Sequence, residues 1–433
     1  MSEASSVLAG QGRTVLDGMG ERLLKLVSKG ATTRQWAEWL RAPLEHAVAN
    51  GDKDLAQCLL TAGANGGAGW RGCNGRTLLQ AAAESGNQEL VSTLLEKGGL
   101  AELDAVSGKD NMTALHRACE RGHTAIARVL MIEGANPSLL DSRQCSVLHY
   151  AAAGGNLELI EYLMIAGVDL HAKNINGYTP LHLAAENGNE KVVCILLRRG
   201  SNTKVANCEG KHAVHLAVDN GHLAALEELL KAGADPNVRY GKSNKHSPLQ
   251  LGRRDVAMMT ALIKHGADVE AVDKLGYTAL HWTATDGVAG VVDALLEAGA
   301  NLEAPSSAVR LCGGYSFKGI TPLHLAAFWR KFEAMASLLH KGANVNVKDH
   351  EGLTPLHVVC KSSVQVHSAE VADFLLRRGA DETVSDKDGQ LALDIVEKCR
   401  DYPASGRLKR LLVKAPADRT WRRRGMLVMC RSR

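Results

Sequence analysis

The chain is poor in several features that mark common protein classes. Aromatic residues make up 4% of its 433 residues. No stretch approaches the ~20 consecutive apolar residues that a membrane-spanning helix needs. The N-terminus lacks a basic region followed by an apolar stretch, and position 2 is serine rather than the glycine that N-myristoylation requires. We therefore expect no transmembrane segment, no secretory signal and no lipid anchor of that type.

The ten cysteines are scattered singly, and none forms a Cys-x-x-Cys pair. This spacing argues against a zinc module and a disulfide framework and favours a reducing compartment: the cytoplasm, with the nucleus as the alternative. The phosphate-binding loop, the zinc-protease motif and the nucleophile elbow are also missing. Residues 67–72 match the spacing of a dinucleotide fingerprint, but they lie in an expected loop rather than between a strand and a helix. We expect no cofactor and no metal ion.

One phrase recurs along the chain. The sequence TPLHLAA at residues 179–185 returns at 321–327, and its first four residues return at 354–357. With looser copies included there are eleven, and four of the ten intervals between them are 33 residues long. Taking the leucine of the phrase (valine once) as the anchor, the copies lie at positions 44, 79, 115, 148, 181, 214, 249, 280, 323, 356 and 393.

The residue types of this phrase predict a pair of helices in each copy. Threonine caps a helix start through its hydroxyl, and proline suits the first turn, where its missing N–H has no consequence. Gly188 is expected to end the first helix in a left-handed turn. A second helix follows over 190–198, with Val192, Val193, Leu196 and Leu197 on its apolar face.

This period and this phrase resemble the ankyrin-repeat family. The resemblance implies an all-α fold, a solenoid of about eleven helix-turn-helix units with hairpin-like finger loops. Because neither helix buries its apolar face alone, neighbouring units must stack. We expect capping helices over residues 1–41, the repeat array over 42–404, and a capping helix followed by a basic tail over 405–433.

The copy anchored at Leu249 departs most from the pattern. Two residues are missing between its helices, and Arg253 and Arg254 replace small residues. We predict a shortened first helix and a weak point in the stack, with sequence drift and a functional hinge as alternative interpretations.

Aromatic residues gather late in the array, where seven of the seventeen fall within residues 277–332. Phe328 and Trp329 occupy the positions of Glu186 and Asn187 in the best copy, and the resemblance implies that these positions face the concave groove. Exposed aromatics are typical interface anchors. The alternative is that an insertion within 303–318 folds back and buries them. The predicted partner-binding residues are Trp282, Arg310, Tyr315, Phe317, Phe328 and Trp329.

Seven of the seventeen histidines follow the anchor residue of seven copies. Successive copies lie one repeat apart, so these side chains cannot converge on one metal ion. The resemblance implies a structural role for them, hydrogen bonding within the repeat.

Charge is uneven along the chain. The net charge is +4, yet residues 405–433 hold ten Lys or Arg and only Asp418 as an acid, so the rest of the chain is acidic. The tail is interpreted as a solvated end, as a ligand for an acidic partner such as the array itself, or as a ligand for nucleic acid, anionic lipid or an import receptor. Nucleic acid is the weaker choice, because only Trp421 is available for stacking. The basic residues concerned are Arg419, Arg422, Arg423 and Arg424.

These observations favour a non-enzymatic scaffold that binds partner proteins through the concave groove and the finger loops. We expect a monomer and other proteins as partners. The alternatives are a substrate-recognition adaptor of a larger complex such as a ubiquitin ligase, and association with acidic partners through the tail. An enzyme is not expected, because about 40 residues before the array and 29 after it are too few for a catalytic core.

Overall fold

The structure is a computed structural model of the whole chain. It describes residues 40–415, except for 51, 62–70, 72–74, 98, 107, 242–245, 308, 311–315, 362–367 and 399–404. The chain divides into two compact units, an N-terminal unit ending at Asn202 and a C-terminal unit beginning at Thr203. Apart from Leu40 and Arg41, the predicted N-terminal capping segment lies outside the described residues.

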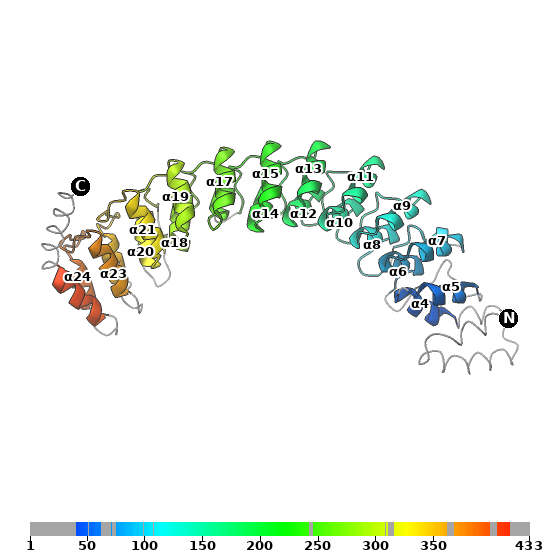
Figure 1. Ribbon diagram of the computed structural model, residues 1–433, viewed down its shortest axis with the longest axis horizontal. Coiled ribbons are helices and arrows are strands. Elements are labelled where there is room, and N and C mark those ends of the chain that lie inside the picture. Colours follow the sequence, from blue (N-terminus) through cyan, green and yellow to red (C-terminus); the bar gives the residue numbers. More distant parts are fainter. Residues whose placement is uncertain are drawn as a thin grey trace, which may run out of the picture. The chain divides into compact units, whose positions relative to one another are not determined.

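Helix pairs build both units (Figure 1). The pairs of the N-terminal unit are α4 (Arg41–Ala49) with α5 (Lys53–Thr61), α6 (Leu78–Ser85) with α7 (Gln88–Glu96), α8 (Ala114–Glu120) with α9 (Thr124–Ile132), α10 (Val147–Gly154) with α11 (Leu157–Ile165), and α12 (Pro180–Glu186) with α13 (Glu190–Arg198). The short helix η1 (Gly99–Glu102) follows α7.

The C-terminal unit continues the same plan. Its pairs are α14 (Ala213–Asp219) with α15 (Leu223–Lys231), α16 (Pro248–Leu251) with α17 (Val256–Lys264), α18 (Ala279–Asp286) with α19 (Ala289–Glu297), α20 (Pro322–Phe328) with α21 (Phe332–His340), and α22 (Pro355–Lys361) with α23 (Ser368–Arg377). Helix α24 (Ala392–Lys398) and a helix over residues 405–415 close the unit. The predicted helical solenoid is confirmed.

The capping of α12 illustrates how each pair forms. Thr179 precedes the helix in an extended conformation, its hydroxyl lies 2.8 Å from Nδ1 of His182, and Pro180 takes the first turn. Gly188 then adopts φ 71°, which a residue with a side chain rarely does. The next helix, α13, buries Val192, Val193 and Leu196. The sequence signals for helix start, stop and apolar face therefore act where they were predicted.

Stacking of like helices makes the core of each unit. In the N-terminal unit the first helices of successive repeats pack against one another, and so do the second helices (Figure 1). The anchor leucines Leu115, Leu148 and Leu181 are at most 1% exposed between these layers. The same arrangement of first helices runs from α14 to α24 in the C-terminal unit.

The recurrent histidines are structural, as predicted. In the repeat of α20, Nδ1 of His324 accepts a hydrogen bond from the backbone N–H of Thr321 at 3.2 Å, and Nε2 donates to the carbonyl of Leu353 at 2.9 Å. A backbone N–H can only donate and a carbonyl can only accept, so the ring must be the neutral form protonated on Nε2. Gln250 makes the equivalent bonds in its own repeat, and its side-chain amide donates to the carbonyl of Tyr277 at 2.8 Å.

The irregular copy has the predicted short first helix. Helix α16 has four residues, whereas the first helices on either side of it, α14 and α18, have seven and eight. Asp286 at the end of α18 accepts hydrogen bonds from Arg253 at 2.6 Å and from Arg254 at 2.9 Å. The two arginines therefore tie the shortened repeat to the next one.

Hydrogen exchange tests whether this copy is also a weak point. We expect the amides of 249–265 to exchange at least about tenfold faster than those of α14 and α18, because α16 lacks about three helical hydrogen bonds, each worth roughly 0.5–1.5 kcal/mol. The Asp286→Asn variant should widen the difference. Equal protection across α14, α16 and α18 would contradict the idea.

The helix over 405–415 buries Leu408 and Leu412 and leaves its basic side chains outside. Arg407 lies 3.2 Å from the carboxylate of Glu370 in α23. This is the amphipathic helix expected after the array. The tail residues Arg419, Arg422, Arg423 and Arg424 lie outside the described residues.

Candidate partner-binding site

Trp282 stands one position after the repeat histidine of α18, and its half-buried side chain has a fixed orientation. Its indole N–H donates to Oδ2 of Asp273 at 2.9 Å. The other carboxylate oxygen of Asp273 accepts the backbone N–H groups of Leu275 and Tyr277 at 2.8 and 2.9 Å. The finger loop thus holds the carboxylate, and the carboxylate holds the indole.

Aromatic and cationic groups surround this indole. The ring of Tyr277 lies edge-on to it at 5.3 Å and that of His246 at 5.8 Å. The guanidinium of Arg253 lies 5.1 Å from the ring centroid, a distance at which a cation is attracted to the face of tryptophan. We call the set of Trp282, Tyr277, His246, Arg253, Arg254, Asp273 and Asp286 the Trp282 cluster.

Charge in the Trp282 cluster is concentrated around Asp286. Partial burial opposes ionisation of this carboxyl, but hydrogen bonds and charges from Arg254 and Arg253 hold its pKa below the ordinary value. Two guanidinium groups share one carboxylate, so this part of the cluster keeps a net positive charge. Arg254 is 73% exposed and can reach a partner.

The row of rings extends into the preceding repeat of the same unit. Tyr240 lies 4.8 Å from the ring of His215, and Nζ of Lys211 lies 5.1 Å from the centroid of Tyr240. Lys211 also pairs with Asp219 at 2.8 Å. Tyr240, His246 and Trp282 are half-buried and therefore present aromatic rings with cations beside them, whereas His215 and Tyr277 are buried.

The N-terminal unit contains a second aromatic side chain that is hydrogen-bonded to an aspartate of its finger loop. Tyr150 occupies the position of Trp282 in its repeat and donates its hydroxyl to Oδ2 of Asp141 at 2.5 Å. Burial, followed by the hydrogen bond to Asp141, raises the pKa of the Tyr150 phenol, which keeps it a neutral donor. Arg143 lies against the same ring. Tyr150 and the two aspartates, Asp141 and Asp273, were not predicted from the sequence.

A shared spacing could have found these pairs. The carboxylate lies five residues before the capping Ser or Thr, and the aromatic donor lies four residues after it, as in Asp141, Ser146 and Tyr150. Asp349 has the same position in its repeat, but its counterpart Val358 cannot donate. Accordingly, Oδ2 of Asp349 is buried without a hydrogen-bond partner in the described part of the chain.

The prediction that Phe328 is an exposed anchor is wrong. Its side chain is 2% exposed and belongs to an apolar cluster, which we call the Phe328 core. Trp329 is half-buried beside it, with the two rings edge-on at 5.3 Å. Apolar residues on neighbouring repeats cover Phe328, which a repeat considered alone does not reveal. The buried members of this core are Tyr277, Ile320, Leu325, Phe328, Leu353 and Val358.

The remaining predicted residues lie in the long insertion. A short antiparallel hairpin forms there from β1 (Val309–Arg310) and β2 (Ser316–Phe317). This fixes the backbone of Arg310 and Phe317, and Tyr315 lies outside the described residues. The structure brings Trp282 and Trp329 to the same apolar core, since both pack against it.

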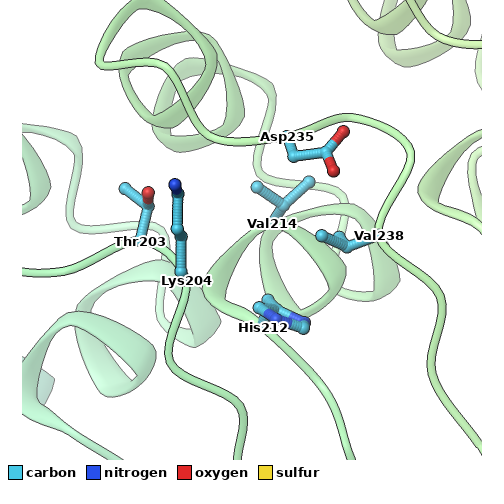
Figure 2. A pocket seen from close by; sticks show the side chains of 6 residues that line it. All are labelled: Thr203, Lys204, His212, Val214, Asp235 and Val238. Atoms are coloured by element: carbon cyan, nitrogen blue, oxygen red, sulfur yellow. The ribbon is translucent and has the colours of Figure 1, made fainter.

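A separate hollow of about 320 Å³ lies at the start of the C-terminal unit. Figure 2 shows Thr203 and Lys204 on one side of it, Val238 and Asp235 on the other, and His212 at the edge. His212 replaces the capping threonine of its repeat, and burial lowers its pKa. The hollow contains none of the predicted partner-binding residues.

Within the described ranges no group of three or more His, Cys, Asp or Glu side chains is placed to hold a metal ion. None of the helices seen there is long and apolar enough to cross a bilayer.

Comparison with known proteins decides the family. A family model described as ankyrin repeats (3 copies) matches residues 44–141, 148–240, 247–349 and 305–388, which is most of the chain. The chain belongs to the ankyrin-repeat family. Ankyrin repeats are generally protein-interaction modules.

Similar stretches occur in much longer proteins. The chain is 41% identical over 70 residues to the palmitoyltransferase Hip14 of Drosophila melanogaster (16% of this chain, 11% of that protein). It is 57% identical over 44 residues to human Rabankyrin-5 (10% and 4%). It is 32% identical over 136 residues to the ankyrin repeat and KH domain-containing protein mask-1 of Caenorhabditis elegans (31% and 5%). The chain spans only about a tenth of these relatives or less, so their activities are not carried over.

Proposed function

We propose that this ankyrin-repeat protein is a non-enzymatic scaffold that binds partner proteins through the first helices and finger loops of its C-terminal unit, centred on Trp282. The observation that carries the proposal is the fixed indole of Trp282, half-exposed between Tyr277 and Arg253. Tryptophan and arginine are the residue types most often found to dominate interface energies. Trp329 extends the surface, and Arg310, Tyr315 and Phe317 of the insertion are proposed as further partner contacts.

Rigidity supports this role. Asp273 orients the indole and Asp286 orients Arg253, so little rotamer freedom remains to be lost when a partner binds. The repeat histidines have structural hydrogen bonds and are not free for catalysis. The cysteines described, Cys58, Cys119, Cys145, Cys194, Cys208 and Cys360, are all free thiols, which suits a reducing compartment such as the cytoplasm or the nucleus.

Partner capture with matched variants tests the proposal. Proteins cross-linked to the wild-type chain are compared with those cross-linked to Trp282→Ala and to Trp282→Phe. The alanine variant should weaken the binding of a true partner by more than ~2 kcal/mol, which is roughly 30-fold in Kd. The phenylalanine variant keeps a ring but loses the bond to Asp273, so it should give an intermediate effect.

Two controls separate binding from folding. Arg254→Gln changes a highly exposed side chain, so it should weaken the binding of an acidic partner while its lost bond to Asp286 lowers the free energy of unfolding by no more than about 1 kcal/mol. Ile175→Gln alters an exposed finger residue of the N-terminal unit and should have no effect. Circular dichroism should first show that the wild type and Trp282→Ala are both folded. Equal affinity of the captured partners for these two folded proteins would contradict the proposal.

A further inference from the structure

Two isoleucines of the N-terminal unit are exposed to solvent at positions where other repeats carry polar residues. Ile132 is 71% exposed and Ile165 is 78% exposed, each two residues before the glycine that ends the second helix. They lie on adjacent repeats, at the ends of α9 and α11 (Figure 1). At the same position, seven other repeats have Glu96, Arg198, Lys231, Lys264, Glu297, His340 and Arg377. The apolar pair is therefore a local departure from the array.

A groove adjoins Ile132. It has a volume of about 370 Å³, lies between α7 and α9, and is lined by Leu95, Leu100, Val129 and Ile132 together with Ser92, Glu96 and Glu133. Leu100 is itself 52% exposed. We call Leu100, Ile132 and Ile165 the apolar ridge. Exposed apolar side chains next to a groove mark a docking site more often than isolated ones do.

Carboxylates border the ridge. Glu96 and Glu133 line the groove, and Glu161 lies one turn before Ile165 on the exposed face of α11. None of the three has an ion-pair partner in the described part of the chain. Of the basic side chains on these repeats, Arg128 pairs with Glu158 at 3.4 Å. This leaves Lys97, and the exposed Arg198 of the next repeat, against three carboxylates. The border of the ridge is therefore acidic along α7, α9 and α11, and Arg198 lies at its α13 end.

We propose that the apolar ridge docks an amphipathic α-helix of a partner protein whose apolar stripe is flanked by Lys or Arg. The apolar side chains of that helix would enter the groove and cover Ile132 and Ile165, while its basic side chains face Glu96, Glu133 and Glu161. Such pairing of opposite charges orients a partner and rejects acidic competitors. This site is in the other unit from the Trp282 cluster and goes beyond the proposed function.

The spacing of repeats favours a helix over a strand as the occupant. Neighbouring packed helices lie ~8–10 Å apart, so ridge residues on adjacent repeats recur at about that distance. Seven residues of an α-helix advance about 10.5 Å and return to the same face. Three residues of a strand cover about 10 Å but end on the opposite face. An apolar residue every seventh position therefore matches the ridge.

Binding of a designed helical peptide to the full-length chain tests the proposal. The probe has about three heptads with leucine on one face and lysine beside it, and a matched peptide has glutamate in place of lysine. Fluorescence anisotropy at about 0.15 M salt should show saturable binding of the lysine peptide and at least about tenfold weaker binding of the glutamate peptide.

Neutral variants assign the binding to the ridge. Replacing both Ile132 and Ile165 by Gln should weaken the binding of the lysine peptide at least about tenfold. The fold should not be destabilised, because exposed substitutions usually change the free energy of unfolding by less than about 0.5 kcal/mol. Replacing both Glu133 and Glu161 by Gln should weaken the binding of the lysine peptide about threefold or more at low salt. At about 1 M salt this variant and the wild type should bind the peptide equally. Ile175→Gln is the matched control, because Ile175 is an isoleucine off the ridge that is 58% exposed.

Three results would overturn the proposal. They are unchanged peptide binding in the Ile132→Gln and Ile165→Gln variant, equal binding of the lysine and glutamate peptides, and self-association of the chain that the same double variant abolishes. The last result would show that a second copy covers the ridge instead.

Discussion

Replacing Phe328 by alanine is expected to destabilise the C-terminal unit by about 3–5 kcal/mol, the range for truncating a buried aromatic side chain. The ring is 2% exposed and packs with Leu325, Leu353 and Val358, which are at most 1% exposed. Its removal would leave a cavity between helices α20 and α22 that rigid neighbours fill poorly. Loss of partner binding in this variant would therefore report unfolding rather than a missing contact.

Trp329→Ala is the matched control. The side chain of Trp329 is half-buried at the edge of the same core. We therefore expect its truncation to lower the free energy of unfolding by about half as much as Phe328→Ala does, or less. Because repeats unfold in a nearly one-dimensional manner, the measurement should be local. Hydrogen exchange of α18, α20 and α22 gives the opening free energy of each helix. A larger loss for Trp329→Ala than for Phe328→Ala would contradict the assignment of Phe328 to the core.

The repeat architecture was predictable because its signals are local. A threonine caps the helix that starts beside it, a glycine such as Gly188 ends the helix before it, and the buried leucines recur at a fixed period. The short helix α16 was found for the same reason, since a missing pair of residues shows in the spacing alone. These features need no knowledge of what lies across the stack.

The site was only partly predictable because it depends on contacts between repeats. Phe328 has the position of an exposed residue in the best copy, and it is buried because Tyr277, Ile320 and Leu353 of the neighbouring finger loops are apolar. The link between Arg253 and Asp286 likewise joins residues 33 positions apart. Within the Trp282 cluster, Trp282 was predicted as a partner-binding residue, and its orienting partner Asp273 was not.

Acidification is expected to destabilise the C-terminal unit through its buried histidines. Burial lowers the pKa of His281 and of His324 to about 4, against about 6.5 in an unfolded chain. Above pH 6.5 both states are neutral and the stabilising contribution is complete. As the pH falls from 6.5 toward 4, only the unfolded state gains a proton, so this contribution is lost progressively and then levels off. Each histidine should account for about 2–3 kcal/mol by pH 4.5.

Glutamine is the most suitable replacement for these histidines, because two repeats of the chain have glutamine at the same position. Gln80 and Gln250 donate to the same kind of carbonyl and cap the same turn without a titratable group. We expect His281→Gln and His324→Gln to be nearly as stable as the wild type at pH 7.5 in urea unfolding. At pH 4.5 each should have lost about 2–3 kcal/mol less than the wild type has.

Carboxylates also titrate over this range, and they are the same in all three proteins. The charges of His281 and His357 help to lower the pKa of His324, so the two single variants are compared together with the double variant. Parallel stability curves from pH 7.5 to 4.5 would mean that these rings accept a proton inside the fold. The neutral tautomer that their backbone hydrogen bonds require, with Nδ1 accepting and Nε2 donating, would then be wrong.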